Sequence, residues 1–399
     1  MRTFLLFCFL LIAGFTAQSQ TRQTIANGLA TNPLIWNCTC IPQPGDVIVI
    51  AHNLTLNTDF GYTSGSLTVN SGASITGDLP TRNLAVAGGA FTNNGTVTIG
   101  NLYHGGGTFT NSGAINVGNA FASDLLAVTS NSGTFSIADS LYINTNATLN
   151  NSGNLSAPST AAAGTFTNTG SFSGTDVWNL GTLNHNAGSF AIANLYTNGS
   201  VVTNAPMTIS GDFWNAENVD INHNLTIGNS LIIGDTLGGP AVFNNDGVIS
   251  IGADLTNSKS ITGTGRFCVA QITTNSGTIS GVDICDLTGG AIDFNSGTIA
   301  MNVTFCATPC GIGVEEGAFY EETIVSVVPN PFNDQFEIRA NAKAHYSLTL
   351  VNNIGQTILS TSFLGDRLML DGSGLASGVY FYRLTSEKGN TASGQLIRQ

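Results

Sequence analysis

Apolar and polar positions alternate in short runs along most of this 399-residue chain. Runs such as residues 97–99 and 115–117 place an apolar side chain at every second position, which is the pattern of a β-strand with one buried face. Asn-x-Gly turns separate many of these runs, and Gly and Asn both accept turn conformations easily. No run after the first twenty residues has the 3.6-residue period of a helix. The pattern predicts an all-β protein with many short strands.

The strands belong to a repeat that runs from about residue 91 to residue 299. The Asn that opens each turn recurs in steps of 18, 20, 20, 17, 18 and 18 residues, at Asn93, Asn111, Asn131, Asn151, Asn168, Asn186 and Asn204. Steps of this size suit one coil of a β-solenoid. We therefore predict a parallel β-solenoid, in the form of a right-handed β-helix, with roughly ten coils over about 50 Å. A stack of unrelated hairpins is the alternative. The weaker regularity between Asn204 and Asn257 predicts an insertion there.

Stacking of coils explains the composition. Like residues in neighbouring coils lie about 4.8 Å apart, so Asn side chains can form hydrogen-bonded ladders while Phe, Val and Ile stack inside. Stacked like charges are unfavourable, which fits the absence of Lys and Arg between Arg82 and Lys259. In a second repeated motif, an apolar residue is followed directly by an aromatic one, and the aromatic residues are Tyr103, Tyr142, Trp178, Tyr196 and Trp214. We expect these rings to stack inside the rod; the alternative is an exposed row that stacks on sugars.

The first nineteen residues have the form of a secretory signal peptide. Arg2 precedes an apolar run of about a dozen residues, and Ala17-Gln18-Ser19 supplies small residues for cleavage. The run is too short to span a membrane. We predict a secreted protein with a signal peptide at residues 1–19 and no membrane span.

Six cysteines remain after this segment, an even number that suits disulfides in an oxidising compartment. Cys268, Cys285 and Cys306 recur with steps of 17 and 21 residues, so they should form a column along the solenoid. We predict the pairs Cys268–Cys285 and Cys306–Cys310, with Cys285–Cys306 as the alternative. In that alternative, Cys38 and Cys40 either form a strained disulfide or stay unpaired. Thiolates spread one per coil make a metal site improbable, and we predict no metal and no cofactor.

Residues 36–50 read Trp-Asn-Cys-Thr-Cys-Ile-Pro-Gln-Pro-Gly-Asp-Val-Ile-Val-Ile. The Pro-Gly-Asp segment predicts a turn and the Val-Ile segment predicts a strand. The whole stretch resembles the Trp…Cys…Pro…Gly-Asp-x-Val-x-Ile opening of secreted bacterial β-helix proteins. The resemblance implies a cap that leads into the first coil.

The last part of the chain differs in kind. Six of the eleven basic residues of the whole chain follow residue 323, and the Asn repeat stops before that point. An acidic segment at 311–323 precedes this last part. This shift marks a domain boundary. We predict a β-helix domain with an N-terminal cap at 20–310, an acidic linker at 311–323 and a C-terminal domain at 324–399. Short alternating strands separated by turn residues predict a small Ig-like β-sandwich for the latter.

This tail also carries a family resemblance. Val-Pro-Asn-Pro-Phe at 328–332, Asn-Ile-Gly-Gln at 353–356, Leu-Ala-Ser-Gly-Val-Tyr-Phe at 375–381 and Gly-Gln-Leu-Ile-Arg at 394–398 occur in order. They resemble the C-terminal sorting domain of the type IX secretion system, with the motif residues Pro329, Asn330, Pro331, Gly355, Gly378 and Tyr380. The resemblance implies export by that machinery in a Bacteroidetes-type bacterium, with release or anchoring to surface lipopolysaccharide. The chain ends in Arg398-Gln399, whereas the family usually ends on a basic residue.

Catalytic patterns are sparse. A β-helix lyase needs a basic residue beside carboxylates that hold Ca²⁺, and a glycoside hydrolase needs two carboxylates at a set separation. The acids of the solenoid are scattered; the nearest cluster comprises Asp212, Glu217 and Asp220 beside Trp214 and His223. Solvated turn acids are the simpler interpretation of that cluster. We predict that residues 21–310 catalyse nothing and that the protein has no catalytic residues.

A net charge of −13 argues against nucleic acid as a partner. The repeat and the tail together predict a secreted or surface-anchored, non-enzymatic β-helix protein, adhesin-like or a structural rod. The alternative is a glycan-binding or polysaccharide-degrading β-helix, and a flat Thr-rich ice-binding face is a more distant one. The predicted partners are the secretion machinery and an extracellular glycan or protein ligand.

Overall fold

The computed structural model describes residues 20–124, 126–234, 241–289, 291–308, 310, 325–352, 356–386 and 391–399. The predicted signal peptide at 1–19, the predicted linker at 311–323 and the motif residue Gly355 lie outside the described residues. The chain divides into two compact units, one ending at Cys310 and the other beginning at Gly311. Within the described part, no helix is long and apolar enough to cross a bilayer.

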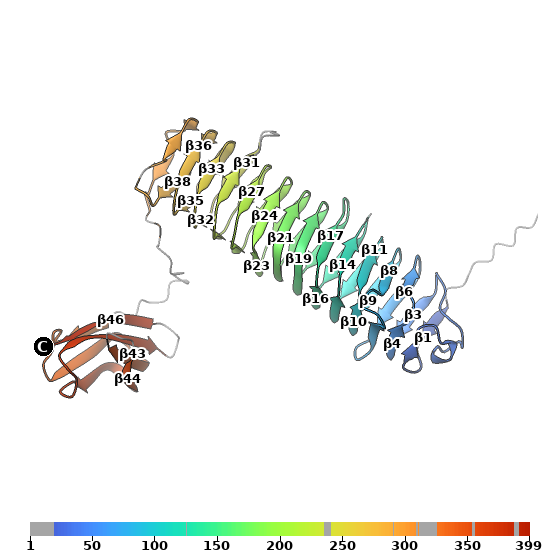
Figure 1. Cartoon of the computed structure of the whole chain (residues 1–399), viewed down its shortest axis with the longest axis horizontal. Coiled ribbons are helices and arrows are strands. Elements are labelled where there is room, and N and C mark those ends of the chain that lie inside the picture. The colour runs from blue at the N-terminus through green and yellow to red at the C-terminus, as the bar shows by residue number, and fades with distance from the viewer. Residues whose placement is uncertain are drawn as a thin grey trace, which may run out of the picture. The chain divides into compact units, whose positions relative to one another are not determined.

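The first unit is a parallel β-solenoid, an elongated stack of short strands (Figure 1). Its coils contribute strands to three faces. The first face contains fifteen strands: β1 (Thr21–Gln23), β3 (Val47–Ile50), β6 (Ser66–Val69), β9 (Ala90–Asn93), β12 (Thr108–Asn111), β15 (Val128–Asn131), β18 (Thr148–Asn151), β20 (Thr165–Asn168), β22 (Thr182–His185), β25 (Ser200–Thr203), β28 (Val219–Ile221), β31 (Val242–Asn245), β34 (Ser260–Gly263), β37 (Thr278–Ile279) and β40 (Thr298–Ile299).

The second face stacks β2 (Gly28–Leu29), β4 (Asn53–Leu56), β7 (Ser74–Gly77), β10 (Thr96–Ile99), β13 (Ala114–Val117), β16 (Thr134–Ile137), β19 (Asn154–Ala162), β21 (Ser171–Asn179), β23 (Ser189–Ile192), β26 (Met207–Ile209), β29 (Leu225–Ile227), β32 (Val248–Ile251), β35 (Arg266–Val269), β38 (Asp283–Asp286) and β41 (Thr304–Phe305). The third face stacks β5 (Phe60–Tyr62), β8 (Asn83–Val86), β11 (Asn101–His104), β14 (Ala120–Ser123), β17 (Ser140–Ile143), the second halves of β19 and β21, β24 (Asn194–Thr197), β27 (Phe213–Asn215), β30 (Leu231–Ile233), β33 (Leu255–Asn257), β36 (Thr273–Asn275) and β39 (Phe294–Asn295).

The prediction of a parallel β-solenoid is confirmed, and the stack is longer than the ten coils expected. Fifteen strands on one face, at ~4.8 Å each, span about 67 Å. The expected length was too short because the repeat was counted only from about residue 91, whereas the coils begin before it, with β3 to β8 at residues 47–86. The handedness of the winding stays a prediction.

Large apolar side chains fill the inside of the stack. Phe91 and Phe109 are fully buried on neighbouring strands of the first face, with their ring centroids 4.7 Å apart. Phe121 and Phe135 pack in the same interior at 4.9 Å. Each strand contributes its alternate residues to this core because successive side chains point to opposite faces. No coil buries this surface alone, so stacking itself supplies the hydrophobic stabilisation.

The predicted Asn ladder is confirmed over five consecutive strands of the first face. The Nδ2 atom of each Asn donates to the Oδ1 atom of the next at 2.7 Å, from Asn93 through Asn111, Asn131 and Asn151 to Asn168. These side chains are buried, with at most 1% exposed. Since buried amides are costly without partners, the ladder holds the corner between the first and second faces in register.

The inward column passes from Asn168 to His185 and then to Thr203, and so leaves the predicted Asn series. The prediction that Asn186 and Asn204 continue this inward column is wrong, because each follows by one residue the residue that does so, His185 or Thr203. Asn186 and Asn204 belong to a separate, outer ladder, in which Asn204 donates to Asn186 at 2.9 Å and Asn222 donates to Asn204 at 2.8 Å. A shift of one residue exchanges the inner and outer sides of a strand, so spacing alone did not distinguish the two.

The predicted insertion lies between β30 and β31. Thr203 pairs with Ile221 after 18 residues, whereas Ile221 pairs with Asn245 after 24. The same jump separates Ile233 from Asn257 on the third face. Six extra residues therefore enter the chain after β30, and the coils on either side stay in register.

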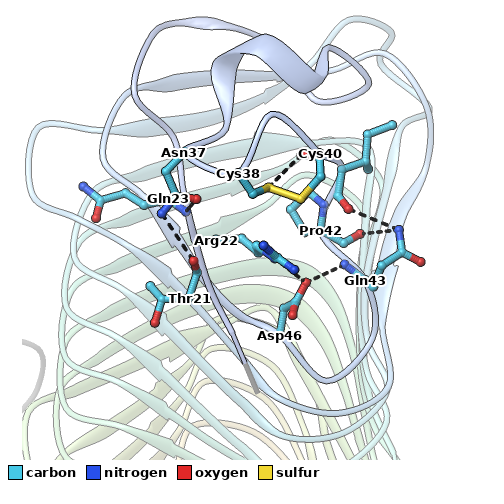
Figure 2. Close-up of polar contacts among 10 residues, drawn as sticks. Thr21, Arg22, Gln23, Asn37, Cys38, Cys40, Pro42, Gln43 and Asp46 are labelled. Carbon is cyan, nitrogen blue, oxygen red and sulfur yellow. Dashed lines mark hydrogen bonds and ion pairs between the residues drawn. A yellow bond between two sulfur atoms is a disulfide. The ribbon is translucent and has the colours of Figure 1, made fainter. Parts of the chain in front are cut away.

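The N-terminal end is closed by a cap of β1, a short 3-10 helix η1 (Pro33–Ile35) and the segment that follows (Figure 2). Trp36 is fully buried and donates from Nε1 to the carbonyl oxygen of Ala30. Asp46 accepts from Arg22 Nε at 3.1 Å and from the Gln43 backbone N–H at 2.9 Å. A disulfide joins Cys38 to Cys40. Figure 2 shows Arg22, Gln43, Asp46 and the Cys38–Cys40 disulfide over the end of the stack.

The far end of the solenoid carries two disulfides whose pairing differs from the prediction. Cys268 and Cys285 lie in register on β35 and β38, as the predicted column requires. They do not pair with each other: Cys268 binds Cys310, and Cys285 binds Cys306, which is the pair named above as the alternative. Phe305 pairs with Ile284, so Cys306 lies beside Cys285 in the next coil. The chain after β41 then brings Cys310 back to Cys268.

The second unit is an antiparallel sheet of five strands: β42 (Val325–Val328), β43 (Gln335–Asn352), β44 (Thr357–Asp371), β45 (Gly378–Ser386) and β46 (Thr391–Arg398). β43 pairs with β42, β44 and β45, and β46 pairs with β45. The antiparallel β-structure expected for this segment is confirmed. Its core includes the fully buried Ile338, Leu348, Leu384 and Leu396. All five strands belong to one hydrogen-bonded sheet because β43 and β44 pair along most of their length.

Candidate functional sites

The third face of the solenoid carries an exposed row of aromatic side chains, which we call the aromatic row. It comprises Tyr103, Tyr142, Trp178, Tyr196 and Trp214. Trp178 is 41% exposed and Trp214 is 49% exposed. The expectation that these rings stack inside the rod is wrong. The residue directly before each aromatic residue points inward instead, as the fully buried Leu141 and Leu195 show.

The row follows one register column of the sheet. Tyr103 pairs with Ala122, which pairs with Tyr142. Tyr142 pairs with Ala161, which pairs with Trp178. An aromatic side chain therefore stands on every second strand of this part of the face, with a small residue between.

The last three aromatic residues of the row lie on three consecutive strands, β21, β24 and β27. Trp178 pairs with Tyr196, and Tyr196 pairs with Trp214. The rings of Trp178 and Tyr196 stack with centroids 5.6 Å apart, and those of Tyr196 and Trp214 meet edge to face at 5.8 Å. Trp214 lies two strands beyond Trp178, so the two-strand spacing extends to the end of the row.

A shallow cavity of about 250 Å³ lies along the dense end of the row. Its lining combines Trp178, Tyr196 and Trp214 with Leu180 and with the exposed Asn198. Aromatic surface beside a few polar groups is typical of small-molecule and sugar binding surfaces. The side chains that build it come from β21, β24, β27 and the turns that follow them.

Acidic groups lie beside the row. The pKa of Tyr103 is raised by burial and by the nearby Asp124 carboxylate. Asp176 lies two residues before Trp178 on β21 and accepts from Nδ2 of Asn194 at 2.8 Å. No basic residue occurs between Arg82 and Lys259, so the whole row lies in a part of the sequence without positive side chains.

A second candidate lies at the corner between the first and second faces, in the last coils. This corner groove has a volume of about 440 Å³. Its lining includes His223, Asp246, Thr264, Arg266, Asp283 and Thr308. Four consecutive coils contribute His223, Asp246, Thr264 with Arg266, and Asp283, each at the turn into its second-face strand or at the start of that strand, and Thr308 follows β41 in the next coil.

Two carboxylates of the groove are held in their ionised form. Asn244 and Thr264 donate to Asp246 and lower the pKa of its carboxyl. Burial acts against ionisation of Asp283, but hydrogen bonds from Ala307 and Thr304 and the charge of Arg266 leave its pKa lowered.

Arg266 stands in register between Val248 and Asp283. His223 accepts the backbone N–H of Asn224 on Nδ1 at 2.8 Å, which places the proton of the neutral ring on Nε2. The groove thus combines a guanidinium, an imidazole and two fixed carboxylates.

The predicted cluster from Asp212 to His223 does not form one site. Asp212 lies at the corner before β27, where its Oδ1 accepts from Asn229 Nδ2 and from the Ser230 backbone. Asp220 points outward from β28 on the first face, and Trp214 points outward from the third. Of this set, His223 enters the corner groove and Trp214 the aromatic row. Residues close in sequence separate because one coil passes through three faces.

Arg266 is the groove residue that the sequence interpretation missed. It lies 18 residues after Val248 and 17 before Asp283, which is the same period that predicted the cysteine column. Applying that period to charged residues would have placed Arg266 beside Asp283. Among the described residues, no group of three or more His, Cys, Asp or Glu side chains is arranged to hold a metal ion.

Asn330 of the sorting motif contacts the last strand of the second unit, β46. Asn330 donates from Nδ2 to the carbonyl of Gln395 at 2.8 Å, and its Oδ1 accepts the N–H of Ile397 at 2.9 Å. Tyr380 is buried and donates its hydroxyl to Ala376. The segment of Pro329, Asn330 and Pro331 is therefore fixed to the last strand, β46. Gly378 begins β45.

Comparison with known families identifies the second unit. Residues 326–398 match the family model described as the secretion system C-terminal sorting domain. The predicted resemblance to a type IX sorting domain is confirmed. The domain indicates a secreted or cell-surface protein that uses the corresponding secretion machinery.

Two enzymes resemble parts of the chain. An endo-acting ulvan lyase from Formosa agariphila is 31% identical over 103 residues, which is 25% of this chain and 20% of the lyase. Chitinase ChiW from Paenibacillus sp. str. FPU-7, a cell-surface-expressed multi-modular enzyme, aligns with 88% of this chain and 24% of its own, at 14% identity and a TM-score of 0.16. This chain thus corresponds to about a quarter or less of either relative's length.

The prediction that the protein is not an enzyme is contradicted by the similarity to the lyase. The relative that shares 31% identity is a lyase. The prediction rested on the scarcity of paired titratable groups along the sequence. It overlooked the corner groove, where His223, Arg266 and Asp283 come from three different coils.

Proposed function

We propose that this chain is an extracellular polysaccharide-active protein that binds its polymer along the aromatic row. One observation carries the proposal: five aromatic side chains occupy one outward column of the third face. Aromatic rings with a negative face suit the weakly positive C–H face of a sugar. The sorting domain supports delivery to the cell exterior, with anchoring to surface lipopolysaccharide or release as its final step.

The physical argument rests on the cost of exposing these rings. Tyr and Trp are large apolar side chains, and an exposed contiguous set of them is typical of a binding surface. The exposed amide side chain of Asn198 at the cavity adds hydrogen bonds that suit hydroxyl groups. Removing water from the rings on binding supplies the hydrophobic part of the affinity.

Affinity electrophoresis through gels that contain single polysaccharides tests the proposal. The protein should be retarded by at least one polymer, and the double variant Trp178→Ala/Trp214→Ala should lose most of that retardation. Ile232→Ala is the matched control, because Ile232 follows Trp214 in the same column. Retardation that is unchanged in the double variant, or absent with every polymer, would reject the proposal.

A second candidate activity is cleavage of the polymer in the corner groove. The similarity to a lyase supports it, together with the grouping of Arg266 and His223. Arg266 offers guanidinium N–H groups that can donate hydrogen bonds to sugar oxygens, and His223 offers an imidazole, the side chain used most often as a general acid or base. Asp246 and Asp283 are held by their hydrogen bonds and so fit a structural role.

Release of new chain ends from acidic and neutral polysaccharides measures this activity. His223→Gln should abolish turnover, and Arg266→Met should weaken it. Asp220→Asn, outside the groove, should leave turnover unchanged. Turnover that survives His223→Gln would place the chemistry elsewhere.

A further inference from the structure

We propose that the aromatic row binds a single extended, neutral, β-linked polysaccharide that runs parallel to the solenoid axis and contacts a ring with every second sugar. The inference rests on the proposed function and specifies its ligand. It follows from three features of the third face: the spacing of the rings, the small residues between them and the charge around them.

The spacing selects the shape of the polymer. Tyr103, Tyr142, Trp178 and Trp214 stand two strands apart along one column, which is about 9.6 Å per interval. An extended chain of equatorially linked pyranoses advances by about the spacing of one coil per sugar. Such a ribbon turns over at each linkage, so equivalent sugar faces recur at every second unit. A helical α-linked chain turns its faces away from a straight row.

The residues between the rings leave room for the other sugars. Ala122 and Ala161 occupy the intervening positions of the column, and both are half-exposed. Tyr196 fills the one remaining interval and stacks on Trp178. The row therefore has a loose end, with one ring per two sugars, and a dense end with continuous aromatic contact.

The charge selects a neutral polymer. Asp124 and Asp176 lie beside the row, and the sequence from residue 83 to residue 258 contains no Lys or Arg. A polyanion would be repelled along the whole length of the row without a cation to balance it.

The four regularly spaced rings span six coil-to-coil intervals of ~4.8 Å each, which corresponds to about seven sugars at one sugar per coil. Titration calorimetry with β-(1→4)-linked glucose oligosaccharides of increasing length should therefore show affinity that rises to about seven units and then levels off. Malto-oligosaccharides and oligogalacturonates of equal length should bind at least about tenfold more weakly. Equal or tighter binding of either series would overturn the inference, and so would affinity that levels off at two or three sugars.

A transposed pair of residues tests the spacing separately. Tyr142→Ala/Ala161→Tyr keeps the number of rings but moves one by a single strand. We expect its affinity to fall about as far as that of Tyr142→Ala alone, and both variants should keep the wild-type far-ultraviolet circular dichroism because the positions point outward. Wild-type affinity in the transposed variant would overturn the spacing argument while the proposed function stands. Absence of binding to every polysaccharide and oligosaccharide, by contrast, would reject the proposed function itself.

Discussion

Replacing Asn151 by Ala interrupts the buried Asn ladder at its centre. Asn151 accepts from Asn131 at 2.7 Å, and donates to Asn168 Oδ1 at 2.7 Å and to the carbonyl of Ser171 at 2.9 Å. Its side chain is 1% exposed, so water cannot replace these bonds. Its neighbour Asn150 lies on the same strand and points to the other side. Asn150→Ala is therefore a control of equal size and chemistry.

The expected loss follows from the partners that remain. A hydrogen bond contributes about 1 kcal/mol net, and an orphaned buried acceptor costs about 1–3 kcal/mol. Asn168 Oδ1 loses its ladder donor, whereas Nδ2 of Asn131 keeps its bond to the carbonyl of Asn154. The free energy of unfolding should therefore fall by about 3–5 kcal/mol in Asn151→Ala, and by less than about 0.5 kcal/mol in Asn150→Ala.

Urea unfolding of the purified protein, followed by far-ultraviolet circular dichroism, measures both variants against wild type. The midpoint should move strongly for Asn151→Ala and barely for Asn150→Ala. A difference between the two variants of under about 1 kcal/mol would show that the ladder follows the fold without stabilising it.

Further predictions concern the ends of the chain and its pH dependence. Mass mapping of unreduced peptides should find Cys268 linked to Cys310, and Cys310→Ser should lower the stability by about 4 kcal/mol, since it opens a loop of 42 residues; a peptide linking Cys268 to Cys285 would contradict this. Burial lowers the pKa of His104 to about 4, whereas an unfolded His binds a proton near pH 6.5. The unfolded state then gains protons first as the pH falls, so stability should drop by about 3 kcal/mol between pH 6.5 and pH 4. His104→Leu should flatten this drop, and an unchanged profile would exclude His104 as its source. A chain that ends at Thr323 should stay inside the cell, and normal export of it would refute the role of the tail.

The fold was predictable because period and alternation act together. A constant step between turn residues fixes the coil length, and alternation fixes which side chains enter the core. Where several polar residues adjoin, as at Asn184, His185 and Asn186, the sequence offers more than one inward position. Packing of the neighbouring coil then decides, and His185 is the residue that enters.

The candidate sites were less predictable, for reasons that differ between them. In a phrase such as Leu195-Tyr196 both residues are large and apolar enough for the core, and only the register of the coil shows that Leu195 fills it. The pairing of Cys310 depends on a segment that leaves the repeat, so no period describes it. The corner groove joins residues from separate coils, so a search for neighbours along the chain does not find it.

Tryptophan fluorescence during a polysaccharide titration tests the central claim most directly. The chain has three Trp residues: Trp36 is fully buried in the cap, while Trp178 and Trp214 are exposed on the aromatic row. Binding along the row predicts a blue shift and protection from iodide quenching, both lost in Trp178→Phe/Trp214→Phe. Retardation by the same polymer in a gel, with no change in emission or quenching, would contradict the account and place the polymer on another face.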